Sequence, residues 1–472
     1  MRLFGFDIKR VKNGKRYYEA ADKGRRSKAF RYVKHTGPNA EIAGALSDLR
    51  SRSRNMTRND GWHKRGVEAI VKHTIGEGIR PAPIGTMQTN KIVKSLWKNW
   101  AEKTTCDWYG KTTLYGLQEQ AMRAIVEGGD MIVLLRRTVP PRGSCELPIK
   151  LQLCEGDVID HLKNGVNDKG VARLGVQYSP EGKLLGYWLF DSHPGDIGFY
   201  SKGLKQSEFW DKENVLHCFE VLRIGQVRGV PFGVAAFTKL NNFCTYEDAQ
   251  LEKQKIAACF AAFITNPDGS DEKDNNDLID RMEPGIIERL GSGEQIEFSD
   301  PPTVGDYDDY STRILQGIAA AYGITYEMLT MDYSRVSFTS GRMGKIDVSP
   351  NFRSWQYNMM VPQFCAPVWE WFIDSCLMTG ALSERVDTDW TAPRVQQLDP
   401  VKETNARIME VNAGFTTRSE IIRENGRDPD EMMSEVKDEN ELMEKLNIIF
   451  PAISTKIKPQ KKEKEENDSE DE

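Results

Sequence analysis

The chain has 472 residues, of which 39% are hydrophobic and 28% are charged, and its mean hydropathy is -0.55. This composition supports packed cores and, by the usual size of domains, about two to four of them. It leaves little room for a membrane protein, because no run approaches the roughly 18 consecutive apolar residues that a spanning helix needs.

Charge is distributed unevenly along the chain. The formal net charge is -6, yet residues 1–80 contain twenty Lys and Arg against eight Asp and Glu, so the remainder is strongly acidic. Such asymmetry predicts nucleic acid or an acidic partner near the basic part. Residues 1–39 are basic and poor in large aliphatic side chains, which indicates an arm that orders on a partner.

The eight cysteines and six histidines indicate neither a disulfide framework nor a metal site. No C-x-x-C pair or H-E-x-x-H pattern occurs, so we expect free, buried thiols in a reducing compartment. The N-terminal residues lack the apolar core and cleavage site of a signal peptide, which predicts an intracellular product. His217 beside Cys218 favours a core or surface position over a metal site, and the alternating acids Asp387 and Asp389 support one only weakly.

The first predicted helical stretch, residues 39–62, carries a stripe of arginines. Arg50, Arg54 and Arg58 are spaced four apart and therefore share one face. Two interpretations stay open: the face is solvated, or it contacts an acidic neighbouring subunit or DNA. Apolar periodicity predicts further helices at residues 66–74, 90–105 and 114–127.

Short strands are predicted next, because β-rich runs alternate with Gly, Pro and Asn. The turn SPEGK, residues 179–183, has the composition of a hairpin turn. The predicted strands are MIVLL, IKLQLCE, RLGVQYS and LLGYWLFD. Together with the helices they predict an α+β fold.

A long helix is predicted at residues 235–264, and about 28 helical residues would make a rod of about 40 Å. TNPDGSDEKDNND stops this helix, and a short β-type segment is predicted at residues 285–298. A second helix is predicted at residues 306–330, where Asp308 and Asp309 suit a helix N-terminus.

Residues 331–345, MDYSRVSFTSGRMGK, place a basic, hydroxyl-rich loop between two predicted helices. A phosphate cradle, a loop that touches a nucleic-acid backbone and a plain surface turn are the three alternatives. The phosphate cradle fails, because it requires G-x-x-x-x-G-K-[ST] between a strand and a helix. Here Ile346 follows Lys345, and no upstream glycine has the right spacing.

Beyond this loop, residues 343–378 indicate a long helix that Pro350, Pro362 and Pro367 must kink or interrupt. A small helical unit follows, with Thr417 as a predicted N-cap. The charged, low-complexity tail is predicted to be disordered. No nucleophile elbow or kinase motif set occurs, so we predict neither catalysis nor a cofactor.

Several stretches, taken in order along the chain, resemble the portal proteins of tailed bacteriophages, in particular the lambda-type portal family. They are LRSRSRNMTRNDGW, LQLCEGDVID, HCFEVLRIGQVRGVPFGVAAF, GIAAAYGITYEMLTMDYSRVSFTSGR and FRSWQYNMMVPQFCAPVWEWF. The resemblance covers residues 38–380, and the order and spacing of these stretches carry it.

The resemblance implies a phage portal protein, which forms a homo-oligomeric ring, dodecameric in the family, at the unique capsid vertex. Such a ring is a conduit for double-stranded DNA during packaging and ejection. The implied partners are the terminase large subunit, the major capsid and scaffold proteins, the head-tail adaptor and DNA bound without sequence specificity; no membrane is implied. The implied location is the virion, after assembly in the host cytoplasm.

Two other functions stay open. The alternative from another class is a DNA-processing enzyme or a motor subunit of the packaging machinery. A nucleic-acid-binding adaptor would use the basic N-terminal part of the chain, residues 1–80.

The family layout implies an α+β fold with an α/β wing, two long stem helices, a small β-containing clip, a kinked wing helix and a helical C-terminal crown. The implied boundaries are a basic N-terminal arm at 1–39, the wing at 40–234, the first stem helix at 235–264, the clip at 265–305, the second stem helix at 306–330, the tunnel loop at 331–343, the kinked wing helix and its connection at 344–395, the crown at 396–450 and a disordered charged tail at 451–472.

The resemblance also implies which residues meet DNA and partners. We expect the two arginines of the tunnel loop to be partly satisfied by acids such as Asp332 or by a neighbouring subunit. The DNA-channel residues are Arg335, Ser337, Thr339, Ser340 and Arg342. The clip candidates for docking terminase or the tail are Glu294, Gln295, Glu297 and Phe298. The subunit-interface candidates are Arg50, Arg54 and Arg58.

Overall fold

The computed structural model describes residues 35–139, 146–196, 206–258, 307–393, 400–425 and 427–446 and the backbone of four short strands outside these ranges. The chain divides into two compact units. Unit 1 contains residues 1–67, 123–136 and 151–322, and unit 2 contains residues 68–122, 137–150 and 323–472. Within the described ranges, no helix has both the length and the apolar character that crossing a membrane requires.

One part of unit 1 consists of helices and a three-stranded sheet. Strand β4 lies between β11 and β5, and β11 is antiparallel to β4 with Val215 opposite Leu134. The elements are α1 (Pro38–Ala43), α2 (Leu46–Asn59), the start of α3 (Gly61–Ile75), β4 (Asp130–Arg137), β5 (Ile149–Glu155), η4 (Gly156–Val158), η5 (Lys212–Asn214) and β11 (Val215–Phe219). The helix predicted at residues 39–62 is divided into α1 and α2, whereas the strands predicted for MIVLL and IKLQLCE are confirmed as β4 and β5.

A five-stranded antiparallel sheet completes the core of unit 1, with the strand order β10-β9-β8-β7-β6. The predicted SPEGK hairpin is confirmed, because the Ser179 N–H donates to the Lys183 carbonyl at 2.8 Å. The strands are β6 (Gly165–Asn167), β7 (Gly170–Arg173), β8 (Val176–Tyr178), β9 (Leu184–Leu189) and β10 (Glu208–Asp211). Side chains from α1, α2 and both sheets, among them Leu46, Ile132 and Leu189, share one buried cluster.

The single strand predicted for RLGVQYS is wrong. The chain turns between β7 and β8, because Leu174 and Gly175 both adopt positive φ angles, 49° and 83°. Neither angle fits an extended strand. The run therefore forms the end of one strand and the start of the next.

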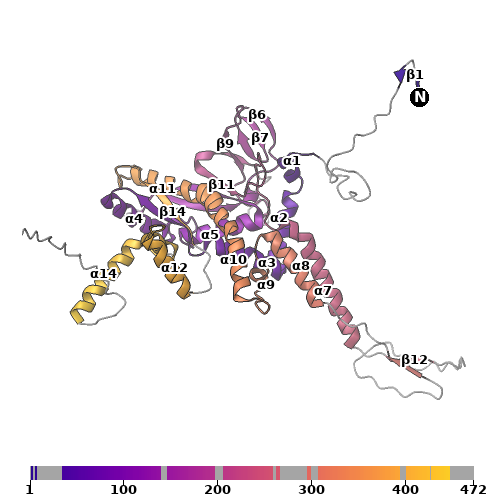
Figure 1. Cartoon of the computed structure of the whole chain (residues 1–472). Helices are drawn as coiled ribbons and strands as arrows, with labels where there is room; N and C mark the ends of the chain where they lie inside the picture. Colours follow the sequence, from indigo (N-terminus) through magenta and orange to yellow (C-terminus); the bar gives the residue numbers. More distant parts are fainter. Residues whose placement is uncertain are drawn as a thin grey trace, which may run out of the picture. The chain divides into compact units, whose positions relative to one another are not determined.

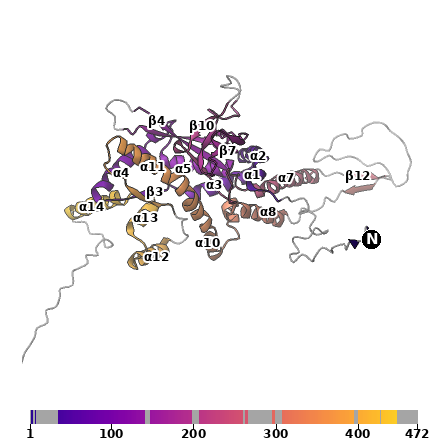
Figure 2. The same ribbon diagram turned by 90° about the horizontal axis from the view of Figure 1, so that it is seen from above.

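Two antiparallel helices form a hairpin in unit 1 and lie side by side in both ribbon views (Figures 1 and 2). They are α7 (Phe237–Ala258), which follows η6 (Val234–Ala236), and α8 (Tyr307–Tyr322). The rings of Tyr246 and Tyr310 lie 4.5 Å apart, and the Tyr307 hydroxyl donates to Glu247 at 3.1 Å. Apolar side chains such as Phe243 and Ile318 are buried. Two long helices are thus confirmed here.

Both predicted long helices are shorter than expected. The first ends at Ala258, and residues 262–265 form strand β12 (Ala262–Thr265), which pairs with β13 (Gln295–Phe298). Phe, Ile and Thr are good strand formers, which is consistent with this switch. The second helix ends at Tyr322, because Gly323 has a φ of +69°, and Thr325 then caps the short helix α9 (Tyr326–Thr330).

Unit 2 has an aromatic core. Trp97 lies 5.0 Å from Trp369 and 4.9 Å from Phe372 between ring centroids, and all three side chains are buried. The elements are β3 (Arg80–Ile84), α4 (Met87–Ala101), η3 (Thr104–Cys106), α5 (Leu114–Gly128), α10 (Phe338–Ser354), the π-helix η7 (Trp355–Cys365), α11 (Ala366–Met378) and β14 (Asp387–Thr391), which pairs with β3. Helix α5 continues into unit 1 at its C-terminal end.

The three prolines do not break the long helix of unit 2. Instead, α10, η7 and α11 follow one another without a gap, and Pro362 lies inside the π-helical segment. The Ala366 N–H donates to Val361, five residues back. A wider turn of this kind absorbs the donor that a proline removes. Buried Gln356 supports the segment by donating to the carbonyls of Thr74 and Pro393 at 2.8 and 2.9 Å.

Three helices close unit 2. They are α12 (Pro400–Asn412), α13 (Arg418–Glu424) and α14 (Pro429–Leu446). The predicted N-cap is confirmed, because the Thr417 hydroxyl accepts from the Glu420 N–H at 3.1 Å. The predicted tail at 451–472 lies outside the described residues, as does most of the predicted N-terminal arm, of which only the backbone strands β1 (Arg2–Leu3) and β2 (Phe6–Asp7) are described before residue 35.

Candidate functional site

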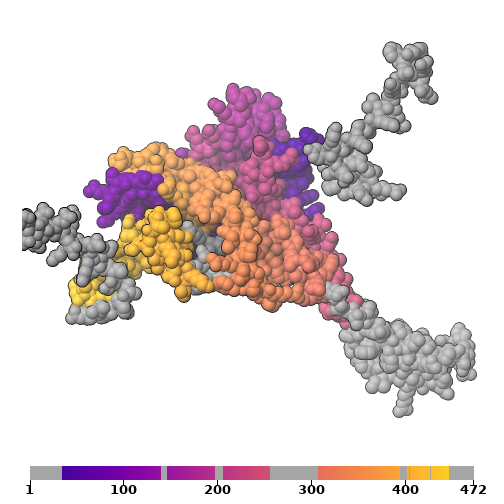
Figure 3. Space-filling model, in the orientation of Figure 1, coloured from indigo at the N-terminus to yellow at the C-terminus, as the bar shows by residue number. Residues whose placement is uncertain are grey.

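The predicted tunnel loop is shorter than the sequence indicated. Helix α9 ends at Thr330, Met331 adopts a left-handed conformation with a φ of 58°, and α10 already begins at Phe338. The loop therefore spans residues 331–337, and residues 338–343 belong to the first turns of a helix. We call residues 331–347 the α10 entry segment. In Figure 3, the orange atoms of the part of the chain that includes α10 lie on the face drawn.

Two of the hydroxyls that were predicted to contact DNA instead cap the N-terminus of α10. The Ser337 hydroxyl accepts from the Ser340 N–H at 3.2 Å, and the Ser340 hydroxyl accepts from the Ser337 N–H at 3.0 Å. This reciprocal capping box satisfies backbone donors that a helix start leaves without partners. Ser337 and Ser340 thus define where α10 begins, whereas Thr339 is exposed on the first turn.

The loop itself is built from tight turns. The Asp332 carboxylate accepts from the Ser334 N–H at 2.9 Å, and the Val336 N–H donates to the Tyr333 carbonyl at 3.2 Å. The Ser334 side chain and backbone stabilise the charged form of Asp332 and lower its pKa, and the positive charge of Arg335 adds to this shift. The charge of Arg335 is the smallest of these influences on the pKa of Asp332, and the expected compensation of the two loop arginines by acids stays a prediction.

Arginines and apolar side chains share the exposed surface of the α10 entry segment. Arg335 and Arg342 are both exposed, and Arg342 has no ion-pair partner among the residues that the structure describes. Sequence reasoning missed the apolar part: Tyr333, Met343 and Ile346 are 60%, 61% and 59% exposed. The surface therefore combines cationic and apolar groups.

The arginine stripe of α2 faces acids of its own chain. Arg50 is buried and donates to the Gly128 carbonyl at 2.8 Å and to Asp130. Arg54 pairs with Asp157 and, at 2.8 Å, with Glu155, while Arg58 is exposed. Both earlier interpretations, a solvated face and an intersubunit face, are wrong for Arg50. The acids come from β4, β5 and η4, which the sequence does not place next to α2.

Asp130 is the centre of this network. Its carboxylate accepts from Arg228 at 2.6 Å and from the buried His217 ring at 3.1 Å, in addition to Arg50. Burial alone would raise the pKa of Asp130, but the charges of Arg228 and Arg50 hold it well below its usual value. Burial lowers the pKa of His217, which keeps the ring neutral at pH 7. Of the two positions left open for His217 and Cys218, core or surface, the structure shows the core.

The sequence did contain a signal for this network. Asp130 is the only charge in GGDMIVLL, and Arg228 lies in an otherwise uncharged run, VRGVPFG. An isolated charge inside an apolar run indicates a buried, paired group. The partner of such a charge is not readable from sequence.

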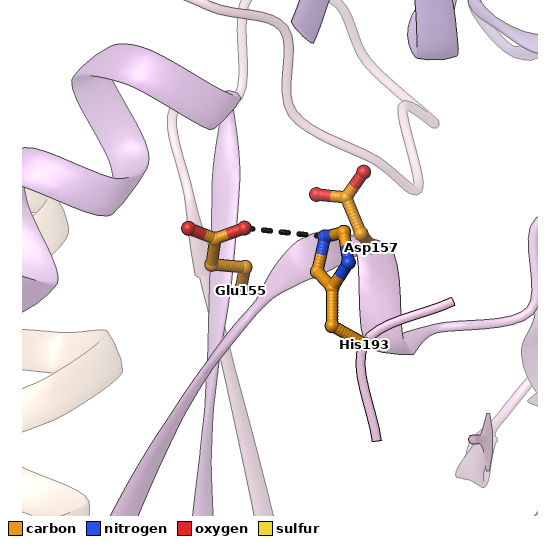
Figure 4. A group of neighbouring side chains, drawn as sticks. All are labelled: Glu155, Asp157 and His193. Carbon is orange, nitrogen blue, oxygen red and sulfur yellow. Dashed lines mark ion pairs between the residues drawn. The ribbon is translucent and has the colours of Figure 1, made fainter. Parts of the chain in front are cut away.

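Glu155, Asp157 and His193 form the one group of described residues with the spacing of metal ligands (Figure 4). The His193 Nε2 lies 3.4 Å from Glu155, and its Nδ1 accepts from the Gly195 N–H at 3.0 Å. In the neutral ring the proton is then on Nε2, which faces the carboxylate and cannot ligate a metal. Because the Arg54 guanidinium already pairs with both carboxylates, these residues fit an ion-pair network and do not fit a metal site.

The other predicted site residues are only partly described. Glu294 lies outside the described residues, and Gln295, Glu297 and Phe298 belong to β13, of which the structure gives the backbone and its pairing with β12. Asp387 and Asp389 are exposed on β14. Six cysteines are described and free, and burial raises the pKa of the Cys106 and Cys376 thiols to about 12.

Comparison with known proteins gives the class of this protein. The family model described as phage portal protein, lambda family, matches residues 23–356. The chain belongs to the lambda family of phage portal proteins, as the resemblance of the sequence stretches indicated.

Individual relatives agree with this family. The probable portal protein of Halomonas phage phiHAP-1 is 23% identical over 431 residues, which cover 85% of this chain and 82% of the relative. Portal protein B of Escherichia phage lambda is 21% identical over 444 residues, covering 82% of each. Among solved structures, the neck of a native GTA particle computed with C12 symmetry matches with a TM-score of 0.45 and 13% identity, covering 78% of this chain and 92% of the other.

Proposed function

We propose that this portal protein assembles as a ring at the unique vertex of a phage capsid and conducts double-stranded DNA during packaging and ejection. The observation that carries the proposal is the family match over residues 23–356. The portal proteins of two phages support it, because each is related to this chain over more than four-fifths of both lengths. The fold supports it through the mixture of sheets and a long helical hairpin.

The elements of the two units can be assigned to the parts of a portal subunit. The α7–α8 hairpin supplies the two stem helices, and the β12–β13 pair between them supplies the clip. The two sheets of unit 1 belong to the wing. The helix that runs from α10 to α11 is the wing helix, and α12 to α14 form the crown.

The α10 entry segment is the candidate for contact with DNA in the channel. It follows α8 and α9 directly in the chain and therefore lies between the second stem helix and the wing helix in sequence. DNA that slides in both directions needs contacts that do not depend on its sequence, and phosphate contacts have this property. Because Ser337 and Ser340 are engaged in capping, Arg335, Thr339 and Arg342 remain the groups best placed for such contacts.

The number of cations limits how strongly such a ring can hold DNA. A protein that neutralises about 6–10 phosphates loses about 10³–10⁵ in DNA affinity over a modest rise in salt concentration. Such a protein therefore binds DNA tightly at low salt, and a ring in which every channel arginine contacted a phosphate would hold the DNA in place. Partial compensation of Arg335 by acids such as Asp332 would weaken its attraction to phosphates. A channel that moves DNA benefits from such partial compensation, because it reduces the drag of each repeated arginine.

The remaining partners follow from this assignment. Terminase and the head-tail adaptor would dock on the clip, where Glu294, Gln295, Glu297 and Phe298 are the candidates. Scaffold and major capsid proteins would contact the wing and the basic N-terminal arm. The protein would assemble in the host cytoplasm and remain in the virion. Among described residues, no observation favours the alternative of a DNA-processing enzyme, because the one cluster with ligand spacing is occupied by an arginine.

Electron microscopy of the purified protein tests the proposal. Negative-stain images should show rings with a central hole, and class averages should give one dominant rotational symmetry. The channel role is tested by packaging: a phage that carries clip substitutions at Glu297 and Phe298 should form heads that remain empty. Monomers at every protein concentration would contradict the ring, and normally filled heads would move the docking surface away from β13.

A further inference from the structure

One buried imidazole connects the α7–α8 hairpin to the helices beside it in unit 1. His63, in the first turn of α3, is fully buried, and its Nδ1 shares a hydrogen bond with the hydroxyl of Tyr322, the last residue of α8. On the other side of the ring, Nε2 lies 3.4 Å from the Ser53 hydroxyl of α2. The ring of Phe237, the first residue of α7, meets the imidazole edge-on, with 5.5 Å between centroids. A single side chain of α3 therefore contacts α2, α7 and α8.

Two glycines leave the space in which the Tyr322 ring lies. A Cβ at Gly233, just before η6 and α7, would overlap the ring, and a Cβ at Gly66 of α3 would lie 3.3 Å from it. Gly233 also has a φ of +69°, which residues with a Cβ rarely adopt. Because protein interiors are close-packed, a larger side chain at Gly233 must displace the Tyr322 ring. We call His63, Gly66, Gly233 and Tyr322 the hairpin joint.

The hairpin joint suits the neutral form of His63. A neutral imidazole has one donor and one acceptor nitrogen, which match two hydroxyls, whereas a protonated ring has two donors and a charge. Asp60, between α2 and α3, accepts from the His63 N–H at 2.7 Å and from the Cys244 thiol of α7 at 3.4 Å. The titratable groups that face the ring from the packed elements are thus Asp60, Cys244 and Tyr322, and burial raises the pKa of the last two. Burial lowers the pKa of His63 to about 4, although the charge of Asp60 and a hydrogen bond with the Ser53 backbone act in the opposite direction.

We propose that the hairpin joint is an acid-sensitive attachment, in which a neutral His63 holds the α7–α8 hairpin against α2 and α3 and a protonated His63 releases it. An exposed histidine titrates near pH 6.5, so the released hairpin takes up the proton before the attached one. The attachment is therefore complete above about pH 6.5 and weakens as the pH falls toward 4. This window lies above the pH range in which Asp130 titrates. The inference concerns the single folded chain and does not depend on the proposed portal function.

Hydrogen exchange of the full-length protein tests the attachment. After correction for the intrinsic pH dependence of amide exchange, peptides from α7 and α8 should exchange about tenfold faster at pH 5 than at pH 7. His63→Gln keeps a neutral side chain with a donor and an acceptor and should abolish this difference. His193→Gln removes a partly exposed histidine of the same unit and should retain it. Because His217 is present in both variants, its own titration cannot account for a difference between them. A pH response that persists in His63→Gln, or one that is absent from the wild type, would overturn the proposal.

A second pair of variants tests the geometry of the joint without changing a titratable group. Gly233→Ala should displace the Tyr322 ring and make α7 and α8 exchange about tenfold faster at pH 7. Gly225→Ala is the matched control, because Gly225 also has a positive φ, 81°, but a Cβ there would meet nothing within 4 Å among the described residues. Its hairpin should exchange at the wild-type rate, and circular dichroism verifies that both variants are folded. Equal acceleration in the two variants would assign the effect to backbone strain and refute the hairpin joint.

Discussion

The arginines of α2 and those of the α10 entry segment look alike in sequence and differ in the structure. Both sets are mixed with serine and threonine and were predicted to meet a partner. Arg50 and Arg54 are instead paired with acids of their own unit, and Arg50 is 2% exposed. Arg335 and Arg342 are exposed. The comparison teaches that an arginine is available to a partner only where no distant segment supplies a carboxylate.

The largest expected effect comes from removing the central carboxylate of the buried network. Asp130→Asn leaves Arg50 and Arg228 buried without their anion, so unfolding free energy should fall by about 3–5 kcal/mol. Urea denaturation followed by circular dichroism measures this loss. Asp48→Asn, at an exposed position of α2, is the control and should change little. A loss below about 1 kcal/mol for Asp130→Asn would show that the network is not what stabilises the fold.

Acid should destabilise unit 1 through the same network. The pKa of Asp130 and the pKa of Asp157 both lie below the value of 3.8 expected for an unfolded chain. Their contribution is therefore complete above about pH 4 and is lost as the pH falls toward the folded values, because the unfolded chain binds the protons first. Denaturation curves between pH 5 and 2 should show a steeper loss for the wild type than for Asp130→Asn. Parallel pH profiles would contradict this assignment.

The helix cap of the α10 entry segment should have a smaller effect. Ser337→Ala removes the N-cap of α10 and should lower stability by about 1 kcal/mol, whereas Ser337→Asp should retain most of it. Thr339→Ala changes an exposed hydroxyl in the same turn and should stay within about 0.5 kcal/mol. Thermal unfolding of the three variants provides the measurement. Equal effects at positions 337 and 339 would argue against the capping box.

The smallest effect on stability is expected for the exposed arginines of the α10 entry segment. Their substitution is therefore tested by DNA binding instead of by unfolding. Arg335→Ala with Arg342→Ala should leave rings intact. The slope of log affinity for DNA against log salt concentration should become smaller by about 1 for each arginine that contacts a phosphate. Binding to double-stranded DNA between low and moderate ionic strength measures the slope. Arg52→Ala with Lys64→Ala, at exposed positions of α2 and α3, is the matched control. An identical slope change in both variants would remove the α10 entry segment from the DNA contact.

The helices, the strands and the family could be read from the sequence because they depend on local pattern. The spacing of apolar residues predicted the α7 and α8 helices, SPEGK predicted its hairpin, and Thr417 predicted its cap. The boundaries were less predictable. Gly323 ends α8 through its positive φ, and residues 262–265 join a strand pair whose other strand, residues 295–298, is distant in sequence. A local pattern does not contain the partner strand.

By itself, the sequence determined the class of fold, the family and the uneven charge of this protein, because each depends on residue identity and spacing along the chain. Only the tertiary structure decided what the charged groups do. It brought Asp130 and Arg228 to Arg50 from segments far along the chain from α2, and it turned Ser337 and Ser340 toward the backbone of α10. A charge is satisfied by whatever lies within a few ångströms, and that neighbourhood exists only after the chain has folded.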